Sequence, residues 1–241
     1  MEKVLGEIAD FLRQYQGLYG RGLYLDGELA TQTPVKHQPL IKKVAPKPMS
    51  GKAALKQRSP QLQAFFEEIS ACQKCVLGKT RKNFVFGYGH PRAKIMFIGE
   101  APGREEDQTG IPFVGPAGKL LDKMLHAIGI SREDVFIANV LKCRPPNNRD
   151  PLPDEVLHCE PYLKRQLELV KPRILVSLGR ISGQTLLRNT LSLSDLRKDV
   201  HEYDGIPLLV TYHPSALLRN PRWKQSSWQD LKRLRKMLDG I

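Results

Sequence analysis

Acidic residues are scarce in this 241-residue sequence, and long apolar runs are missing. The 38 Lys and Arg residues outnumber the 25 Asp and Glu residues, which gives a formal net charge of +13 at pH 7. Because a basic surface attracts phosphates, this balance favours a polyanion such as nucleic acid as partner; the alternative is that excess lysine only keeps the protein soluble. No segment approaches the ~20 apolar residues of a membrane span, and the N-terminus lacks a signal-peptide core, so we expect a cytoplasmic protein with no membrane partner.

Cysteine is also scarce, with four residues in the whole chain. In an intracellular protein we expect metal ligands or buried thiols rather than disulfides. Cys72 and Cys75 are separated by two residues, and Cys143 and Cys159 follow much later in the chain. This spacing allows all four thiolates to meet around zinc or a [4Fe-4S] cluster, and it does not distinguish between the two.

Residues 29–59 contain no Asp or Glu at all but hold seven Lys or Arg residues and four prolines. We interpret this segment as a disordered basic linker, either a passive tether or an arm that contacts DNA. Before it, apolar residues at helical spacing over 2–19 predict an amphipathic helix within an N-terminal extension, 1–28. Residues 1–59 are thus a candidate site for a protein partner, and 60–241 are the expected catalytic domain.

Short apolar runs alternate with amphipathic segments throughout the expected domain. This alternation predicts an α/β fold, with three layers (α/β/α) and a central, mainly parallel four-stranded sheet. A helix over 154–170 contains Pro161, which is expected to interrupt it. The expected strands are 95–98, 135–140, 173–178 and 207–212; the other expected helices are 61–71, 118–128, one after Gly179 and 223–238.

Polar side chains follow three of the expected strands. Glu100 comes after the first strand, Asn139 lies at the end of the second, and His213 follows the last. Each has an ordinary structural explanation when taken singly, as a helix cap, a turn residue or a surface histidine. Because open α/β sheets bind ligands at the carboxyl ends of their strands, the three together predict a functional site.

Several short motifs surround these residues. They are Gly-Glu-Ala-Pro-Gly (99–103), Glu-Asp (106–107), Gly-Ile-Pro-Phe-Val-Gly (110–115), Ala-Gly (117–118), Asn-Val-Leu-Lys-Cys-Arg (139–144) and His-Pro-Ser (213–215). Together they closely resemble the motifs of the family 4 uracil-DNA glycosylases, over Leu62 to about Leu238. The resemblance implies an enzyme that hydrolyses the N-glycosidic bond of deoxyuridine in DNA and leaves an abasic site. It also implies a [4Fe-4S] cluster held by Cys72, Cys75, Cys143 and Cys159, with zinc as the alternative.

The same resemblance assigns roles in catalysis and base recognition. Glu100 would orient or deprotonate the attacking water, and His213 would stabilise the negative charge on the departing base. Phe113 would stack on the flipped base, and Asn139 would read the uracil edge. Gly99 and Ala101 complete the expected substrate-binding loop.

Two departures from family 1 of the same superfamily affect these expectations. Family 1 has aspartate at the position of Ala101, so Glu100 is the nearest substitute as water activator. Family 1 also has tyrosine at the position of Gly103, and here Glu106 resembles the family 4 residue that excludes the methyl group of thymine. The loop after the motif contains no histidine of the kind that traps a related subgroup on DNA, so we expect ordinary turnover. Separately, we expect the protein to be a monomer.

DNA contacts are expected from the His-Pro-Ser loop. Pro214, Ser215, Leu217 and Arg219 would place an apolar wedge beside a cation, as suits the gap left by a flipped base and a nearby phosphate. The alternative function is a catalytically weak or inactive DNA-binding protein of the same fold that acts with a replication or repair partner. A nucleotide hydrolase is disfavoured because the chain has no Gly-x-x-x-x-Gly-Lys-Ser/Thr motif.

Overall fold

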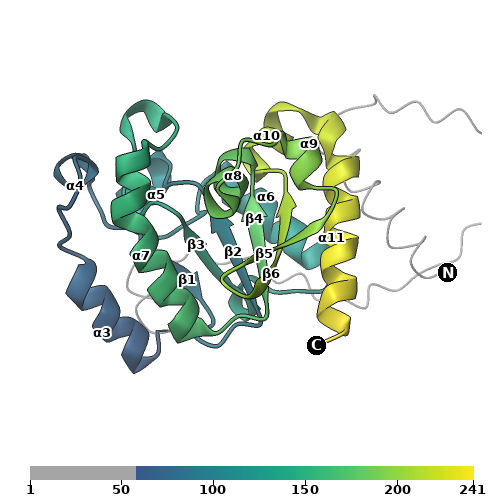
Figure 1. Ribbon diagram of the computed structural model, residues 1–241, viewed down its shortest axis with the longest axis horizontal. Coiled ribbons are helices and arrows are strands. Elements are labelled where there is room, and N and C mark those ends of the chain that lie inside the picture. The colour runs from purple at the N-terminus through teal and green to yellow at the C-terminus, as the bar shows by residue number, and fades with distance from the viewer. Residues whose placement is uncertain (1–57) are drawn as a thin grey trace, which may run out of the picture. The chain divides into compact units, whose positions relative to one another are not determined.

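The computed structural model describes residues 58–241 of the chain (Figure 1). The helix expected over 2–19 and nearly all of the linker expected over 29–59 lie outside these residues. The predictions made for residues 1–57, including that of a protein partner, therefore stay predictions.

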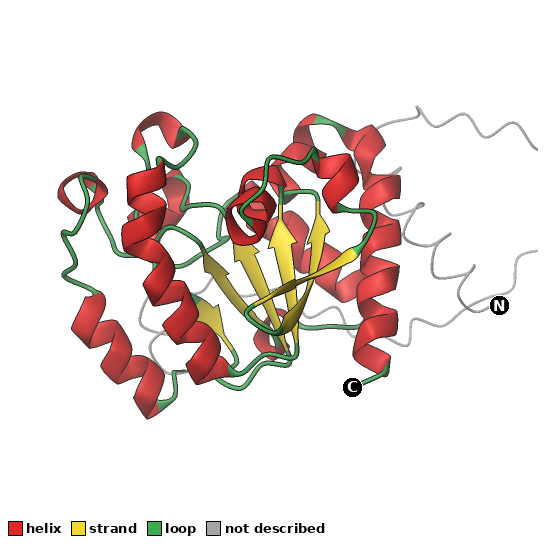
Figure 2. Ribbon diagram, viewed as in Figure 1, coloured by secondary structure: helices red, strands yellow, loops and turns green. Residues whose placement is uncertain are grey.

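A mixed six-stranded sheet forms the centre of the described part (Figure 2). The strand order is β1-β3-β2-β4-β6-β5; the four inner strands are parallel, and each outer strand pairs antiparallel with its neighbour. Gly99 lies opposite Asn139 in the β2–β3 register, so these two strands end at the same edge of the sheet. The strands are β1 (Tyr88–Gly89), β2 (Ile95–Gly99), β3 (Phe136–Asn139), β4 (Ile174–Leu178), β5 (Val200–Tyr203) and β6 (Ile206–Thr211).

The prediction of a mainly parallel sheet is confirmed, but the predicted number of four strands is wrong. The two missed strands, β1 and β5, form the edges of the sheet. β1 has only two residues, and three of the four residues of β5 are at least partly exposed. Neither strand therefore contains the continuous apolar run that marks a strand buried on both faces.

Helices surround the sheet and account for most of the remaining chain. The first of them shows how local sequence sets an element boundary: the Ser59 side chain accepts a hydrogen bond from the Leu62 N–H at 3.3 Å, and Pro60 occupies the first helical position. The α-helices are α3 (Pro60–Ile69), α4 (Leu77–Thr80), α5 (Arg104–Thr109), α6 (Pro116–Ala127), α7 (Pro153–Val170), α8 (Arg180–Leu187), α9 (Leu193–Leu196), α10 (Pro214–Arg219) and α11 (Lys224–Asp239). Short 3₁₀ turns are η1 (Arg132–Asp134), η2 (Pro146–Asn148) and η3 (Pro221–Trp223).

Pro161 does not interrupt α7, which continues through it for 18 residues. A proline inside a helix leaves the carbonyl four residues earlier without its usual partner. That carbonyl belongs to Leu157, and both Leu157 and Pro161 are exposed, so water can satisfy the freed group. The expected interruption is therefore wrong.

Alternate side chains of β2 enter two separate hydrophobic clusters. Met96 and Ile98 pack with side chains of α3 and α7. Ile95 and Phe97 pack with side chains of α6 and α11. Because successive side chains of a strand point to opposite faces, helices cover both faces of the sheet. Within residues 58–241, no helix is long and apolar enough to cross a membrane.

Candidate active site

The carboxyl ends of the parallel strands lie at one edge of the sheet, where their arrowheads point in Figure 2. Asn139 is the last residue of β3, Glu100 directly follows the last residue of β2, and His213 lies two residues beyond β6. The predicted placement of an acid, an amide and an imidazole at this edge thus agrees with the topology. What each group does chemically depends on its surroundings.

Gly99 is the point at which the amide of Asn139 and the ring of Phe113 meet. A Cβ atom built on Gly99 would overlap the Asn139 Oδ1 and would lie 2.8 Å from the Phe113 Cζ. Any residue other than glycine would therefore push the amide and the ring apart. The absence of a side chain here lets the amide and the ring lie together at the end of β2, and we call this junction of Gly99, Phe113 and Asn139 the slot.

The Asn139 amide is buried but not satisfied. The residue is 2% exposed, and its Oδ1 has no hydrogen-bond donor within residues 58–241. A buried acceptor without a partner costs about 1–3 kcal/mol, so it is kept only where something compensates. An N–H group of a bound ligand is the natural partner for this oxygen.

A buried lysine fixes the backbone that carries this amide. Lys142 is 0% exposed, and its Nζ donates hydrogen bonds to the Asn139 carbonyl at 2.7 Å and to the Gln166 Oε1 at 2.6 Å. Gln166 in turn donates to the Phe86 carbonyl at 2.7 Å. Burial lowers the pKa of Lys142 to about 8. Sequence reasoning missed Lys142 and Gln166, because only the packing of α7 on β3 brings them together.

Lys142→Met is expected to lower the free energy of unfolding by about 1–3 kcal/mol, because it leaves the Asn139 carbonyl and the Gln166 side chain without their donor. Urea unfolding followed by circular dichroism measures this change. Lys123→Met, on the exposed side of α6, is the matched control and should change stability by no more than about 0.5 kcal/mol. Equal midpoints for the two variants would show that the buried network does not stabilise the fold.

The loop that carries Phe113 is held in an unusual conformation. Phe113 has a φ of 54°, in the left-handed region that costs a non-glycine residue about 1–3 kcal/mol. The Glu106 Oε1 accepts hydrogen bonds from the backbone N–H groups of Val114 at 2.9 Å and Gly115 at 3.0 Å. A Cβ atom on Gly118 would overlap the Phe113 carbonyl, so glycine is required there. These contacts hold the aromatic ring against the slot.

The second carboxylate oxygen of Glu106 lies over Gly103. A Cβ atom built on Gly103 would be 2.6 Å from the Glu106 Oε2. The lack of a side chain at Gly103 therefore leaves the space that this carboxylate occupies. Glu106 both fixes the Phe113 loop and fills part of the loop that follows β2.

The ring of His213 lies next to Phe113, with 5.5 Å between the ring centroids and an angle of 34° between the planes. The His213 Nδ1 accepts a hydrogen bond from the Ser215 N–H at 3.1 Å and lies 2.7 Å from the Ser215 Oγ. Because a backbone N–H can only donate, Nδ1 carries no proton, and the neutral ring has its proton on Nε2. Burial, with a smaller contribution from Arg219, lowers the pKa of His213 to about 4. The imidazole is therefore a neutral donor at physiological pH.

Glu100 has a different environment from His213. Burial, together with a smaller contribution from Asp150 and an opposing one from Arg180, raises the pKa of this carboxyl group to about 7. Asp150 and Arg180 are themselves 3.8 Å apart. A carboxyl group with a pKa near neutrality is suited to general acid–base catalysis.

Comparison of the sequence with known proteins assigns the chain to a family. The model of the uracil DNA glycosylase superfamily matches residues 86–232. The type-4 uracil-DNA glycosylase of Archaeoglobus fulgidus is 46% identical over 181 residues, which cover 72% of this chain and 91% of that protein. The corresponding protein of Saccharolobus solfataricus is 47% identical over 188 residues (74% and 87%), and that of Thermotoga maritima is 42% identical over 165 residues (68% and 86%). The chain belongs to the type-4 uracil-DNA glycosylases.

The four cysteines of this type-4 chain belong to or pack against one hydrophobic cluster, and none of them forms a disulfide. Cys143 and Cys159 are each close enough to Cys75 for a thiolate there to raise their pKa, although burial is the larger cause, and the pKa of Cys159 rises to about 12. Burial therefore disfavours an isolated thiolate at Cys159 unless a positive centre is bound. Within residues 58–241, no three His, Cys, Asp or Glu side chains are arranged to hold a single metal ion.

Hydrogen-bond donors surround three of these sulfur atoms. Such donors stabilise thiolates and are typical of the surroundings of iron–sulfur ligands, so the chemistry of the set fits a cluster. The donors are the Tyr162 hydroxyl at 3.1 Å and the Lys74 N–H at 3.5 Å to Cys72, the Arg81 Nη1 at 3.1 Å to Cys143, and the Lys142 N–H at 3.3 Å to Cys159. Lys142 thus contacts both the cysteine region and the strand end of Asn139.

The short helix α10 carries the residues expected to contact DNA. Pro214 is buried, Ser215 bonds to His213, and Arg219 is exposed. Leu217, however, is 1% exposed and packs in the core with α6 and α11, so it has no side-chain surface to offer to DNA. Its neighbour Leu218 is 37% exposed and is the leucine of this loop that reaches the surface. Of these two leucines only Leu218 therefore has side-chain surface for the predicted wedge, because helical geometry turns one of the two outward.

Proposed function

We propose that this chain removes uracil from DNA by hydrolysing the N-glycosidic bond, and leaves an abasic site that starts base excision repair. The observation that carries this proposal is the buried Asn139 Oδ1 beside the Phe113 ring, which has no hydrogen-bond partner among residues 58–241. Such a slot fits a flat heterocycle that offers an N–H group to the amide oxygen. The family membership of the chain supports the same reaction.

Uracil complements both polar groups of the Asn139 amide. The amide oxygen accepts from the uracil N3–H, while the amide NH₂ donates to O4. Cytosine presents the opposite pattern and would leave buried polar groups unpaired, which supports discrimination by roughly 10⁴-fold or more. To reach the slot the base must leave the stack, at a cost of a few kcal/mol that is smallest for a mispaired base. Stacking on Phe113 offsets about 1–3 kcal/mol of that cost.

Bond cleavage builds negative charge on the departing base and positive charge on the sugar. The His213 Nε2–H would donate to O2 of the base and stabilise the developing anion without first having to lose a proton. Glu100 in its ionised form would orient or deprotonate the attacking water and offset the positive charge of the sugar. Ala101 offers no functional group for this step, which leaves Glu100 as the acid of the loop.

Exclusion of thymine is assigned to Glu106. Its carboxylate occupies the space above Gly103 that a side chain at that position would fill. Because its other oxygen is bonded to two backbone N–H groups of the Phe113 loop, this carboxylate cannot move freely away from a methyl group. DNA contacts are assigned to Arg219 and to Leu218 on α10, with Pro214 and Ser215 shaping the loop.

The four cysteines, Cys72, Cys75, Cys143 and Cys159, would hold a [4Fe-4S] cluster. The cluster would supply structural cross-linking, because its ligands tie the turn after α3 to the Cys143 loop and to α7. Anaerobic purification followed by iron analysis and visible absorption tests this assignment. A colourless protein that contains zinc would overturn it.

The activity itself is tested with labelled oligonucleotides that contain either uracil or thymine at one position. After incubation, alkaline treatment cleaves the strand at abasic sites, and we expect cleavage of the uracil strand alone. If the full-length chain binds these oligonucleotides but neither strand is cleaved after alkaline treatment, the alternative is favoured: a DNA-binding protein of the same fold that has lost catalysis.

The pKa of Glu100 predicts how the rate of the reaction depends on pH. Because the pKa of Glu100 is raised to about 7, the group is mostly protonated below that pH and ionised above it. If the ionised form is required, the single-turnover rate rises through about pH 7 and then levels off. Glu100→Gln should lower the plateau roughly 10²–10⁴-fold and remove the step. A profile that keeps its step in this variant would assign the titration to another group.

A further inference from the structure

An aromatic pair next to the His213 loop has no part in the uracil slot. The rings of Tyr212 and Trp223 are stacked, with centroids 5.3 Å apart and planes at 24°. Tyr212 directly precedes His213 in the chain, and Trp223 ends the η3 turn between α10 and α11 (Figure 1). The pair therefore lies at the carboxyl edge of the sheet, as the slot does.

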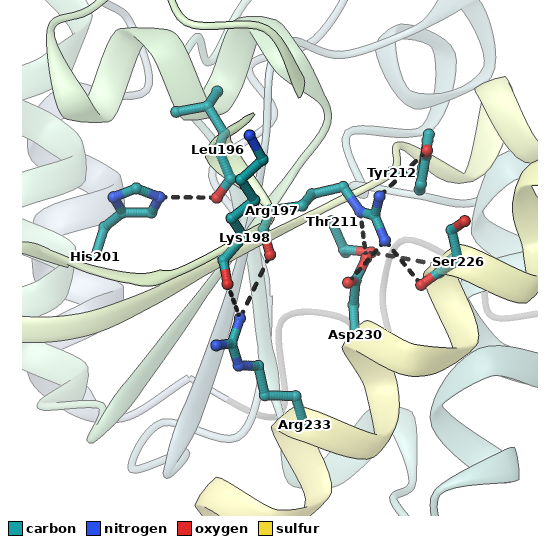
Figure 3. Close-up of polar contacts among 10 residues, drawn as sticks. Leu196, Arg197, Lys198, His201, Thr211, Tyr212, Ser226, Asp230 and Arg233 are labelled. Carbon is teal, nitrogen blue, oxygen red and sulfur yellow. Dashed lines mark hydrogen bonds and ion pairs between the residues drawn. The ribbon is translucent and has the colours of Figure 1, made fainter. Parts of the chain in front are cut away.

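A buried ion pair holds this stack in place (Figure 3). The Arg197 guanidinium lies 4.4 Å from the centroid of the Tyr212 ring. It donates to both Asp230 oxygens, at 2.7 and 2.9 Å, and to the Ser226 carbonyl at 2.9 Å. Asp230 also accepts from the Thr211 hydroxyl at 2.6 Å. Because α11, β6 and the segment after α9 all contribute, the Tyr212 ring on which the indole stacks is fixed before any ligand binds.

Trp223 nevertheless remains 42% exposed, which is unusual for a large aromatic side chain already packed on another ring. Its surroundings on the same edge combine apolar and cationic side chains: Leu218 is 37% exposed, and Arg219 and Arg222 are exposed. A fixed, exposed aromatic ring beside cations is the arrangement that proteins use to stack bases of single-stranded nucleic acid.

We propose that Trp223 is a stacking platform for an unpaired base of the DNA strand that carries the excised uracil. The proposal rests on the proposed function in that the ligand is DNA. The exposed Arg219 and Arg222 complement the negative charge of phosphates, and Tyr212 is directly continuous with the His213 loop. Both features favour a nucleic acid over a peptide at this surface. Because a paired base keeps both faces inside the duplex, the platform favours single-stranded over double-stranded substrate.

The test compares dissociation constants for oligonucleotides that carry a stable abasic analogue, which no glycosylase can cleave, as single strand and as duplex. Trp223→Ala is expected to weaken single-strand binding roughly 5- to 150-fold and duplex binding less than about twofold. Trp223→Phe keeps an aromatic face and should restore most of the affinity. Val76→Ala, at a 63% exposed apolar position on the remote α4 turn, is the matched control and should bind both DNAs as the unchanged chain does.

Three outcomes would overturn the platform. The first is an unchanged affinity of Trp223→Ala for single-stranded DNA, and the second is an equal loss of affinity for single strand and duplex. The third is a Trp223→Phe variant that does not recover single-strand affinity although its melting temperature equals that of the unchanged chain. Because the probe contains no uracil, the result is independent of catalysis. If the unchanged chain excises no uracil but Trp223→Ala weakens single-strand binding, the proposed function is wrong and the stacking role of Trp223 is still supported.

Discussion

Asn139→Ala is expected to abolish uracil excision, with a fall in the single-turnover rate of roughly 10⁴-fold or more. The amide is the polar group buried at the centre of the slot, and its Oδ1 has no other partner in the described part of the chain. Without it, the uracil N3–H and O4 would enter a buried slot with nothing to bond, and each unsatisfied group costs about 1–3 kcal/mol. The base would then remain stacked in the DNA.

The binding of DNA that already contains an abasic site should be nearly unchanged in Asn139→Ala, because no base then enters the slot. Asn189→Ala, in the turn beyond α8, is the matched control and should excise uracil at the rate of the unchanged chain. Single-turnover assays under enzyme excess, together with binding to an abasic analogue, separate recognition from general DNA affinity. Excision that persists in Asn139→Ala would remove this residue from the role of base reader.

The strands that bear the site could be predicted because they are buried on both faces. Ile95 to Ile98 read as an uninterrupted apolar run, and the glycine after them marks the end of the strand. Since parallel strands share one carboxyl edge, the approximate position of Glu100, Asn139 and His213 followed from the order of the elements alone. The edge strands β1 and β5 are short or largely exposed and carry no such signal.

Features that depend on three-dimensional packing could not be predicted. Nothing in the sequence marks Lys142 as buried, yet it is 0% exposed, because α7 brings Gln166 over β3 as a partner for its ammonium group. The two leucines of α10 are adjacent and chemically identical, and only the orientation of the helix decides that Leu217 is buried and Leu218 is exposed. The tautomer of His213 likewise depends on a bond from the Ser215 backbone.

His213→Ala is expected to slow the chemical step roughly 10²–10³-fold, with little change in affinity for uracil-containing DNA. The loss corresponds to about 2.7–4 kcal/mol, the usual contribution of one donor placed where negative charge develops. The proposed Nε2–H bond to the base would be weak in the ground state and strong in the transition state, so the rate rather than the dissociation constant should respond. His126→Ala, at an exposed position on α6, is the matched control and should react normally.

The protonation state of His213 can be separated from that of Glu100 by measuring the pH profile in Glu100→Gln. An ordinary histidine titrates near pH 6.5, but burial, with a smaller contribution from Arg219, lowers the pKa of this imidazole to about 4. The remaining activity of Glu100→Gln should therefore be flat from about pH 5.5 upward, because neither group then changes charge. A residual step near pH 6.5 in Glu100→Gln that disappears in the double variant with His213→Ala would show that the imidazole becomes charged in this range. The developing anion would then be stabilised by an imidazolium and not by a neutral donor. In that case the rate would rise as the pH falls, whereas a neutral donor leaves it constant.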